Sequence, residues 1–343
     1  MTKKSEILLI YTGGTIGMVK DYKSNALKAF NFDHLYKKIP ELKQLDCTIE
    51  VISFEIPIDS SNINVKYWVD ILEIIEEYYP KKDGFVVLTG SDTMSYTSSA
   101  ISFMIENLKK PVIFTGSQLP IGDLRTDAKE NLITAIQIAS ARKNNNEAVV
   151  TEVGLYFEYK LYRANRTTKI NAEQFEAFTS ANYPPIAESG VHLKFNSSFL
   201  LKSDLNKKTL FRKKLNENIV ILKLFPGITK QVVEGVLEIY NLKGVVLETY
   251  GSGNAPTEKW FIELLKTAID KGIYIVDVTQ CIGGSVIFGQ YETSTALKRI
   301  GLINGKNITT ESAIAKLMYL LGERIDKSNF KTQFENSLRG EMN

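Results

Sequence analysis

Hydroxyl side chains follow three apolar runs of the chain, each at the point where the run stops. These hydroxyls lie in the stretches 12–17, 89–93 and 115–118, which come after the runs 7–11, 85–88 and 112–114. A hydroxyl attacks a carbonyl carbon once a neighbouring base takes its proton. Loops after the carboxyl ends of parallel strands lie along one edge of the sheet. We therefore predict that these loops gather their oxygens at one site, with Thr12 and Thr15 on either side of a glycine pair.

Few histidines are available to act as the base that such a hydroxyl needs. The chain has two histidines, His34 and His192, and neither lies beside one of these loops. A Ser-His-Asp or Cys-His mechanism therefore has weak support. A carboxylate, or a lysine kept neutral by burial, serves the same purpose. Asp92 directly follows Ser91, and Lys169 ends a polar run of arginine and threonine, so both are candidates for moving the proton.

A fourth loop, Asp59-Ser60-Ser61, adds a carboxylate and two more hydroxyls after another strand-like run. Each candidate also has a purely structural interpretation. The serines and Asp92 are residue types that cap helices, and Lys169 is one of 42 basic residues. The glycine pair also suits a phosphate, although no Walker-A lysine or G-x-G-x-x-G follows it. The spacing favours a hydroxyl-based hydrolase over a phosphate-binding enzyme or a ligand-binding domain, and it leaves both alternatives open.

Alternating strand and helix patterns must position these loops. The predicted helices cover 64–79, 95–108 and 126–142, and the predicted strands cover 7–11, 48–54, 85–88, 111–115 and 148–157, the last as one strand or a pair. This alternation predicts an α/β fold with a doubly wound, mostly parallel sheet. The polar stretch 19–31 suits a flap beside the site or an ordinary surface loop.

A chain of 343 residues is too long for one ordinary core. Periodicity is lost after residue 183, and short apolar strands return at 219–224, 244–247 and 273–276. We predict a larger N-terminal catalytic α/β domain over 1–190, a linker over 191–218 and a smaller C-terminal α/β domain over 219–343.

Composition argues against a nucleic-acid or membrane protein. The net charge of +3, from 42 basic and 39 acidic residues, includes no long block of one sign. No apolar run is long enough to span a bilayer, and the first strand follows the N-terminus without a signal peptide. The two cysteines, Cys47 and Cys281, provide neither a disulfide framework nor a metal cluster. We therefore expect a cytoplasmic protein.

The same loops resemble the asparaginase/glutaminase family. Residues 9–17 look like the first signature of that family, and residues 84–94 look like the second. Five further stretches match the type I, cytoplasmic bacterial L-asparaginases in the same order, namely 59–61, 115–118, 161–169, 250–256 and 338–341. These matches span nearly the whole chain.

The resemblance implies a reaction and its catalytic residues. The reaction is the hydrolysis of L-asparagine to L-aspartate and ammonia through an acyl-enzyme, with no metal or organic cofactor. By resemblance, Thr15 is the nucleophile that attacks the side-chain amide. Ser91, Asp92 and Lys169 form a second, triad-like group that moves protons.

The resemblance also assigns the substrate-binding residues, which are Asp59, Ser60, Ser61, Ser91 and Asp92. Ser60 and Ser61 would hold the α-carboxylate, and Asp92 the α-ammonium group. A zwitterion needs one acceptor carboxylate and several donors, and these two loops supply both. The expected partner is the small-molecule substrate, without nucleic acid or membrane. The resemblance further implies a homotetramer built as a dimer of dimers, with each site near a subunit interface.

Three positions depart from the family pattern. Ser91 stands where the second signature has threonine, which keeps the hydroxyl and removes the methyl group. The flap tyrosine has no clear equivalent, because Ala26 lies near its place and Tyr22 lies a few residues early. Glu248 stands where type I enzymes with an effector pocket carry arginine. A carboxylate there repels the carboxylate of an effector, so we expect no effector response to asparagine.

Two other functions remain as alternatives. One is the ammonia-releasing component of a tRNA-dependent amidotransferase, which by resemblance carries an extra N-terminal domain, whereas Thr15 lies almost at the start of this sequence. The other is a non-catalytic asparagine sensor, which would lack a nucleophile or lysine, whereas Thr15, Asp92 and Lys169 are all present. The preference between asparagine and glutamine stays open.

Overall fold

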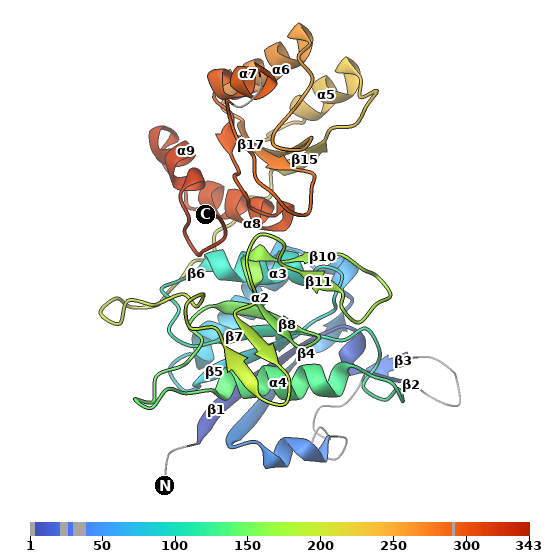
Figure 1. Ribbon diagram of the computed structural model, residues 1–343, viewed down its shortest axis with the longest axis vertical. Helices are drawn as coiled ribbons and strands as arrows, with labels where there is room; N and C mark the ends of the chain where they lie inside the picture. The colour runs from blue at the N-terminus through green and yellow to red at the C-terminus, as the bar shows by residue number, and fades with distance from the viewer. Residues whose placement is uncertain (1–3, 21–26, 30–38, 290–291) are drawn as a thin grey trace. The chain divides into compact units, whose positions relative to one another are not determined.

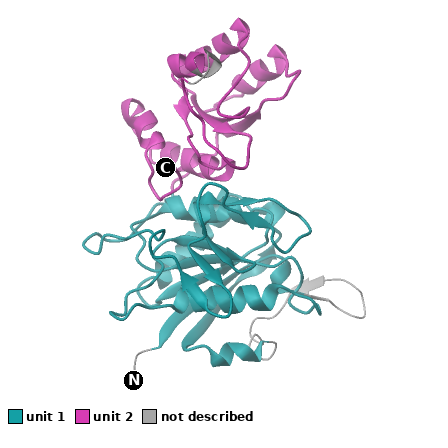
Figure 2. Ribbon diagram, in the orientation of Figure 1, with its two compact units in different colours: residues 1–213 teal, residues 214–343 magenta. Residues whose placement is uncertain are grey.

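The computed structural model describes residues 4–20, 27–29, 39–289 and 292–343 of the chain. It contains two compact units, Met1–Lys213 (unit 1) and Lys214–Asn343 (unit 2), which Figure 2 shows in different colours. Their boundary falls inside the segment 191–218, and the limits of the linker predicted there stay a prediction. Among the helices in these ranges, none combines the length and the apolar character that crossing a bilayer requires.

Unit 1 is built on an eight-stranded sheet with the order β13-β12-β9-β8-β7-β5-β1-β4. Its strands are β1 (Ser5–Gly13), β4 (Cys47–Ile58), β5 (Gly84–Leu88), β7 (Val112–Thr115), β8 (Val153–Phe157), β9 (Lys160–Arg163), β12 (Ala187–Ser189) and β13 (Leu193–Phe195). The pairs from β4 through β1, β5 and β7 to β8 are parallel, and the pairs from β8 to β13 are antiparallel. The predicted mostly parallel sheet is therefore confirmed.

Helices cover both faces of this sheet (Figure 1). They are α2 (Val65–Tyr78), α3 (Met94–Met104) and α4 (Ala128–Ser140). Helix α4 shares a core cluster with Ile7 and Leu9 of β1. Because strand side chains alternate between faces, the equally buried Leu8 points to the other side, where α2 and α3 lie. Burial on both faces explains why the parallel strands are unbroken apolar runs in the sequence.

Two segments differ from the sequence prediction because short strands pair across the chain. Helix α3 ends at Met104, before the predicted residue 108, because the chain continues as β6 (Ile105–Glu106) and pairs with β14 (Leu210–Phe211). Strand β13 lies within the segment predicted as a linker, where it pairs with β12. Strands of two or three residues are too short to show a period in the sequence, so neither pairing was predictable.

The remaining elements of unit 1 are short: η1 (Thr15–Gly17), β2 (Met18–Lys20), β3 (Leu27–Ala29), η3 (Pro40–Gln44), η4 (Ser60–Asn62), η5 (Ala164–Arg166), β10 (Thr168–Lys169) and β11 (Phe178–Thr179). Strands β2 and β3 pair antiparallel at the two ends of the predicted flap. Tyr22 and Ala26, between them, lie outside the described residues. Strands β10 and β11 form a second antiparallel pair, which carries Lys169.

Unit 2 is a smaller α/β domain, as the sequence predicts. Its four strands pair in parallel in the order β15-β16-β17-β18. The elements are β15 (Ile219–Lys223), α5 (Lys230–Leu237), β16 (Gly244–Thr249), α6 (Lys259–Asp270), β17 (Tyr274–Thr279), α7 (Glu292–Ile300), β18 (Ile303–Asn304), α8 (Thr310–Gly322) and α9 (Lys327–Glu335). Strand and helix alternate from β15 to α8, which is the order that parallel pairing requires.

Asp277, on β17, is a carboxyl group buried in the core of unit 2. Its side chain is 0% exposed, and its Oδ1 accepts a hydrogen bond of 2.7 Å from Thr249 Oγ1. Its Oδ2 finds no hydrogen-bond partner within the described part of the chain. Burial disfavours the charged form and raises the pKa of Asp277 from 3.8 to about 7.

This pKa predicts that the protein loses stability as pH rises. Between pH 3.8 and about 7, folded Asp277 holds a proton that the unfolded chain has released. The free energy of unfolding should therefore fall through this window by up to roughly 4 kcal/mol, and then level off above pH 7. Asp277→Asn, which cannot ionise, should lack this component and be the more stable protein at pH 8.

Urea unfolding of both proteins at pH 5 and pH 8 checks this prediction. The difference between their free energies of unfolding should change by about 3 kcal/mol between the two pH values. The other titrating groups cancel in the comparison because both proteins contain them. Parallel pH profiles would show that Asp277 is already ionised at pH 5.

Candidate active site

Glycines bring three of the predicted site loops into contact at the carboxyl edge of the unit 1 sheet. Strand β1 lies between β4 and β5, so the loops after these strands are neighbours. Gly14 has a φ of +86°, and a Cβ atom there would collide with the main chain of Gly90. A Cβ atom on Gly90 would in turn lie 2.5 Å from Ser60 Oγ. Close approach of the loops therefore requires glycine at both positions.

The two threonines beside the first glycine pair have different surroundings. Thr12 is 1% exposed, and its Oγ1 donates a 3.0 Å hydrogen bond to the carbonyl oxygen of Leu88. That bond ties β1 to β5 and gives Thr12 a structural part. Thr15 is half-buried and begins η1 directly after Gly14. The hydroxyl of Thr12 is therefore held on β1, whereas Thr15 lies in the loop that follows the strand.

Ser91, Asp92 and Lys169, which the sequence places far apart, form one hydrogen-bonded cluster. Lys169 Nζ donates to Ser91 Oγ at 2.9 Å and to Asp92 Oδ1 at 2.7 Å. The side chain of Lys169 is 17% exposed, whereas that of Asp92 is 67% exposed. Lys169 is therefore held by these two partners instead of extending into solvent. The exposed carboxylate of Asp92 keeps room for a second cationic group.

Asp59 acts within its own loop. Its Oδ1 accepts hydrogen bonds from the Ser61 main-chain nitrogen at 2.9 Å and from Ser61 Oγ at 2.8 Å, as the N-cap of η4. These bonds hold the pKa of the Asp59 carboxyl below its usual value. Ser60 is 4% exposed, and its carbonyl oxygen accepts a 2.8 Å hydrogen bond from Thr93 Oγ1. The loop is therefore fastened to the Ser91 loop through Thr93.

Capping of the helices α2 and α3 does not account for Ser60, Ser61 or Asp92. The N-cap of α2 is Asn64, whose side chain accepts from the Lys66 nitrogen at 3.0 Å, so neither Ser60 nor Ser61 caps that helix. The N-cap position of α3 belongs to Thr93, and Asp92 binds a lysine instead.

Gln118 is a member of the cluster that the sequence analysis did not single out. Ser91 Oγ donates to Gln118 Oε1 at 3.2 Å. The hydroxyl of Ser117, by contrast, donates to the carbonyl oxygen of Leu119 at 2.6 Å. Gln118 lies in the third strand-end loop, which was predicted to join the site through its hydroxyls. The signal for Gln118 was its place in that loop, because nothing in its residue type indicates catalysis.

Other residues named from the sequence lie elsewhere or are not described. His192 is exposed, and His34 lies outside the described residues. Glu248, at the end of β16, is 9% exposed. Its carboxylate pairs with Lys223 Nζ at 3.1 Å and accepts from Thr310 Oγ1 at 2.6 Å. Its charge is thus already partnered inside unit 2.

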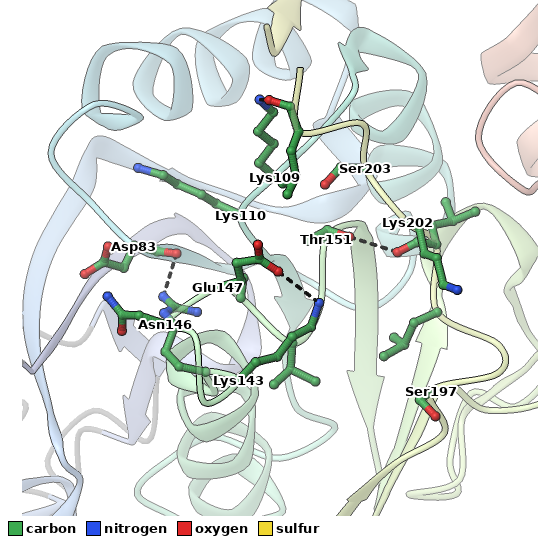
Figure 3. Close-up of a pocket in the computed structure, with 16 residues that line it drawn as sticks. Asp83, Lys109, Lys110, Lys143, Asn146, Glu147, Thr151, Ser197, Lys202 and Ser203 are labelled. Atoms are coloured by element: carbon green, nitrogen blue, oxygen red, sulfur yellow. Dashed lines mark hydrogen bonds and ion pairs between the residues drawn. The ribbon is translucent and has the colours of Figure 1, made fainter. Parts of the chain in front are cut away.

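A cavity of about 480 Å³ lies at the opposite edge of the unit 1 sheet, and Figure 3 shows the residues that line it. Its lining includes Asp83 and the stretches 109–110 and 148–151, which precede β5, β7 and β8, whereas the site loops follow strands. Several of its charged groups bind neighbouring residues of the lining. Arg142 donates to the carbonyl oxygen of Asp83 at 2.7 Å, and Lys143 pairs with Glu147. None of the predicted site residues lines this cavity.

The clustered groups are suited to hydroxyl chemistry. A threonine hydroxyl, a serine hydroxyl, a lysine and a carboxylate can together supply a nucleophile and a path for its proton. Within the described residues, no group of three or more His, Cys, Asp or Glu side chains could hold a metal ion.

Comparisons with known proteins cover both units. Residues 6–200 match the family described as "Asparaginase, N-terminal", and residues 218–334 match "Glutaminase/Asparaginase C-terminal domain". L-asparaginase 1 of Escherichia coli (strain K12) is 38% identical over 344 residues, covering 100% of this chain and 99% of that protein. The crystal structure of L-asparaginase I from Vibrio cholerae O1 biovar eltor matches with a TM-score of 0.90 at 35% identity, covering 99% of this chain and 100% of that one.

Another relative is named for a different function. It is a glutamyl-tRNA(Gln) amidotransferase component of Pyrococcus furiosus, 30% identical over 344 residues, which cover 98% of this chain and 76% of that protein.

Proposed function

Because the chain belongs to the asparaginase/glutaminase family and is an amidohydrolase of the L-asparaginase kind, we propose that it hydrolyses L-asparagine through an acyl-enzyme on Thr15. The observation that supports this mechanism best is the Lys169–Ser91–Asp92 cluster, with contacts of 2.9 Å and 2.7 Å. Ser91 and Asp92 lie in the loop that packs against the loop of Thr15. A hydroxyl nucleophile needs such a proton-transfer group nearby.

In the first half of the reaction, Thr15 Oγ1 bonds to the side-chain amide carbon of asparagine. The hydroxyl proton of Thr15 passes through the neighbouring groups to the amide nitrogen. The carbon–nitrogen bond then breaks, and ammonia leaves. Main-chain N–H groups of the two glycine loops are the candidate donors to the oxyanion that forms on the way. The product of this half is an ester between Thr15 and the aspartyl group.

In the second half, water attacks the ester carbonyl, and Ser91 with Lys169 takes the proton of the water. The ester bond breaks, Thr15 regains its proton, and aspartate leaves. Asp92 holds Lys169 close to Ser91 through its Oδ1. No cofactor is needed in either half, because every proton that is taken up is returned.

The substrate head group would bind between the two acidic loops. Asp92, with an exposed carboxylate, would accept from the α-ammonium group, and the Ser91 loop would flank it. Ser60 would donate to the α-carboxylate, and Ser61 would do so once its hydroxyl proton turns from Asp59 Oδ1 to the substrate. Asp59 would support the loop, because its bond from the Ser61 main-chain nitrogen fixes the backbone there. A charge-assisted bond to each end of the zwitterion would select free amino acids over peptides.

An assay of ammonia release tests this function directly. The purified protein should release ammonia from asparagine without a partner protein, and a parallel assay with glutamine measures its preference. The amidotransferase alternative predicts little release until a partner protein and tRNA are added. The sensor alternative predicts asparagine binding, measured by calorimetry, without release.

The assembly and location of the protein are part of the same proposal. We propose a cytoplasmic homotetramer, because the chain matches L-asparaginases over its full length and has only two cysteines, neither of them paired. Sedimentation of the purified protein would check the assembly.

Ser91 provides a test of the proton-transfer group. Because the hydroxyl is what this role needs, Ser91→Thr should keep kcat within about tenfold, or about 1.4 kcal/mol of barrier. Ser91→Ala, which removes the acceptor of the Lys169 hydrogen bond, should lower kcat by roughly a hundredfold or more. The kcat values for ammonia release from both variants check this prediction. Equal activity of the alanine and threonine variants would show that the hydroxyl takes no part in catalysis.

A further inference from the structure

Gln118 reaches from the third strand-end loop to Ser91 and to the β10–β11 hairpin that carries Lys169. We propose that Gln118 is a positioning residue, which orients the hydroxyl of Ser91 and holds the hairpin of Lys169 so that a proton can pass between them. This inference rests on the proposed function of Ser91 and Lys169. It extends that function to a residue outside both family signatures, in the further matching stretch 115–118.

The hydrogen bonds of Gln118 determine which way its side-chain amide faces. Its Nε2 donates to the carbonyl oxygen of Ala172 at 3.2 Å and to that of Gln174 at 3.0 Å. Carbonyl oxygens only accept, so the NH₂ group must face them. The other end of the amide, Oε1, therefore faces Ser91 Oγ, 3.2 Å away.

This orientation also determines where the Ser91 proton points. A protonated lysine has only donors, so Lys169 Nζ donates to Ser91 Oγ across 2.9 Å. Ser91 must then direct its single proton elsewhere, and Gln118 Oε1 is the acceptor. The hydroxyl oxygen is thus held between the two side chains, with a lone pair on Lys169. When Lys169 has passed its proton along the relay to the departing amide nitrogen, a short rotation about the Ser91 C–O bond is enough to turn the hydroxyl towards Lys169.

The hydrogen bond from Ser91 to Gln118 is important because residue 91 is a serine. Threonine is stiff about χ1 because two heavy atoms branch at its Cβ, whereas serine can occupy three staggered rotamers. This chain has serine where the family signature has threonine. The hydrogen bond from Ser91 to Gln118 supplies a constraint that the missing methyl group would otherwise provide.

Gln118 is itself held firmly. Its main-chain nitrogen donates to Asp127 Oδ2 at 2.9 Å, and Asp127 is 6% exposed at the start of α4. Ala172 and Gln174 lie in the loop between β10, which ends at Lys169, and β11. Gln118 therefore connects Asp127 through its main chain with the Ser91 hydroxyl and the hairpin of Lys169 through its side chain. Because Gln118 contacts Ser91 directly and the hairpin of Lys169 through Ala172 and Gln174, its loss should affect the chemical step.

Gln118→Met tests this inference, because methionine keeps the length of the side chain and removes both hydrogen-bonding ends. We expect kcat to fall about tenfold and KM to change less than about twofold, since positioning for chemistry would be lost without loss of a substrate contact. The matched control is Gln137→Met on the exposed side of α4, which should leave both constants unchanged. If Gln118→Met unfolds, Gln118→Asn should give the same result, because it is too short to reach both sides. Wild-type kcat in a folded variant, or a loss confined to KM, would overturn the inference.

Combining this change with substitutions of Ser91 separates positioning from general loosening of the loop. In a Ser91→Ala background, Gln118→Met should lower kcat by less than about twofold, because the hydroxyl it acts on is gone. In a Ser91→Thr background, the β-branched side chain should restore part of the lost turnover. A full tenfold loss in both backgrounds would mean that Gln118 does not act through Ser91.

The same set of proteins distinguishes failure of this inference from failure of the proposed function. If Ser91→Ala alone keeps wild-type turnover, the proposed role of Ser91 fails, and the inference fails with it. If Ser91→Ala lowers kcat and Gln118→Met lowers it further by its full factor, only the inference about Gln118 fails.

Discussion

Replacing Thr15 by valine should lower kcat for asparagine by roughly four orders of magnitude without unfolding the protein. Valine has nearly the shape of threonine and lacks the oxygen, so it cannot form the ester intermediate. The remaining activity would come from substrate binding and the surrounding donors alone. The position tolerates the change sterically, because Thr15 is half-buried at the start of η1. Steady-state kcat for ammonia release, measured on protein with the wild-type circular dichroism spectrum, checks this expectation.

Thr12→Val is the matched control for this experiment. It makes the same change three residues earlier, near the end of β1, where the hydroxyl donates to the Leu88 carbonyl oxygen at 3.0 Å. Losing that buried hydrogen bond should lower the free energy of unfolding by about 1–3 kcal/mol and leave kcat within about tenfold of wild type. If the two variants lost equal activity, the loss would reflect a disturbed loop, and Thr15 would not be the nucleophile.

The second large effect is expected from Lys169→Met, which should lower kcat by roughly a hundredfold to ten-thousandfold. Methionine fills a similar volume and cannot take or give a proton. Ser91 would lose its 2.9 Å donor, and Asp92 would lose its 2.7 Å partner. Assays of kcat and KM for asparagine test this prediction. Lys194→Met, at an exposed position of β13, is the control and should behave as wild type.

The double variant Thr15→Val/Lys169→Met adds a second criterion. Residues that act in one catalytic unit are strongly non-additive, so the double variant should be no slower than the slower single variant by more than about threefold. Losses that multiply in full would indicate that Thr15 and Lys169 serve separate steps with no shared intermediate. Near-normal turnover of a folded Lys169→Met protein would remove Lys169 from the mechanism.

The hydrophobic pattern of the sequence alone was sufficient to predict the main strands of unit 1. The runs at 7–11, 85–88 and 112–114 are apolar throughout because helices cover both faces of the sheet, and this leaves no polar position for solvent. Their short length, their branched residues and the glycines that follow them identify them as buried strands without knowledge of their neighbours. The loops at the ends of these runs could therefore be placed at one edge, together with the residues 15 and 91 that they carry.

Tertiary structure decided which of those side chains meet. Ser91 and Lys169 are 78 residues apart, and their hydrogen bond depends on the β10–β11 hairpin, whose two-residue strands leave no periodic signal in the sequence. The sequence also could not show which of Thr12 and Thr15 has the structural role, because both have the same side chain and lie on either side of one glycine pair. Burial against Leu88 assigns Thr12 to structure.

The same limit applies to Asp59 and Gln118. A carboxylate beside two serines suits substrate binding and capping equally well as a pattern, and only the loop conformation shows that Asp59 holds Ser61. Gln118 is neutral and carries no catalytic signature, and its importance arises from the carbonyl groups of Ala172 and Gln174, which turn its oxygen towards Ser91. A periodic pattern records whether a residue is buried, because burial repeats with the geometry of the element. The partner of a polar side chain depends on strand order and loop conformation, which only the folded chain determines.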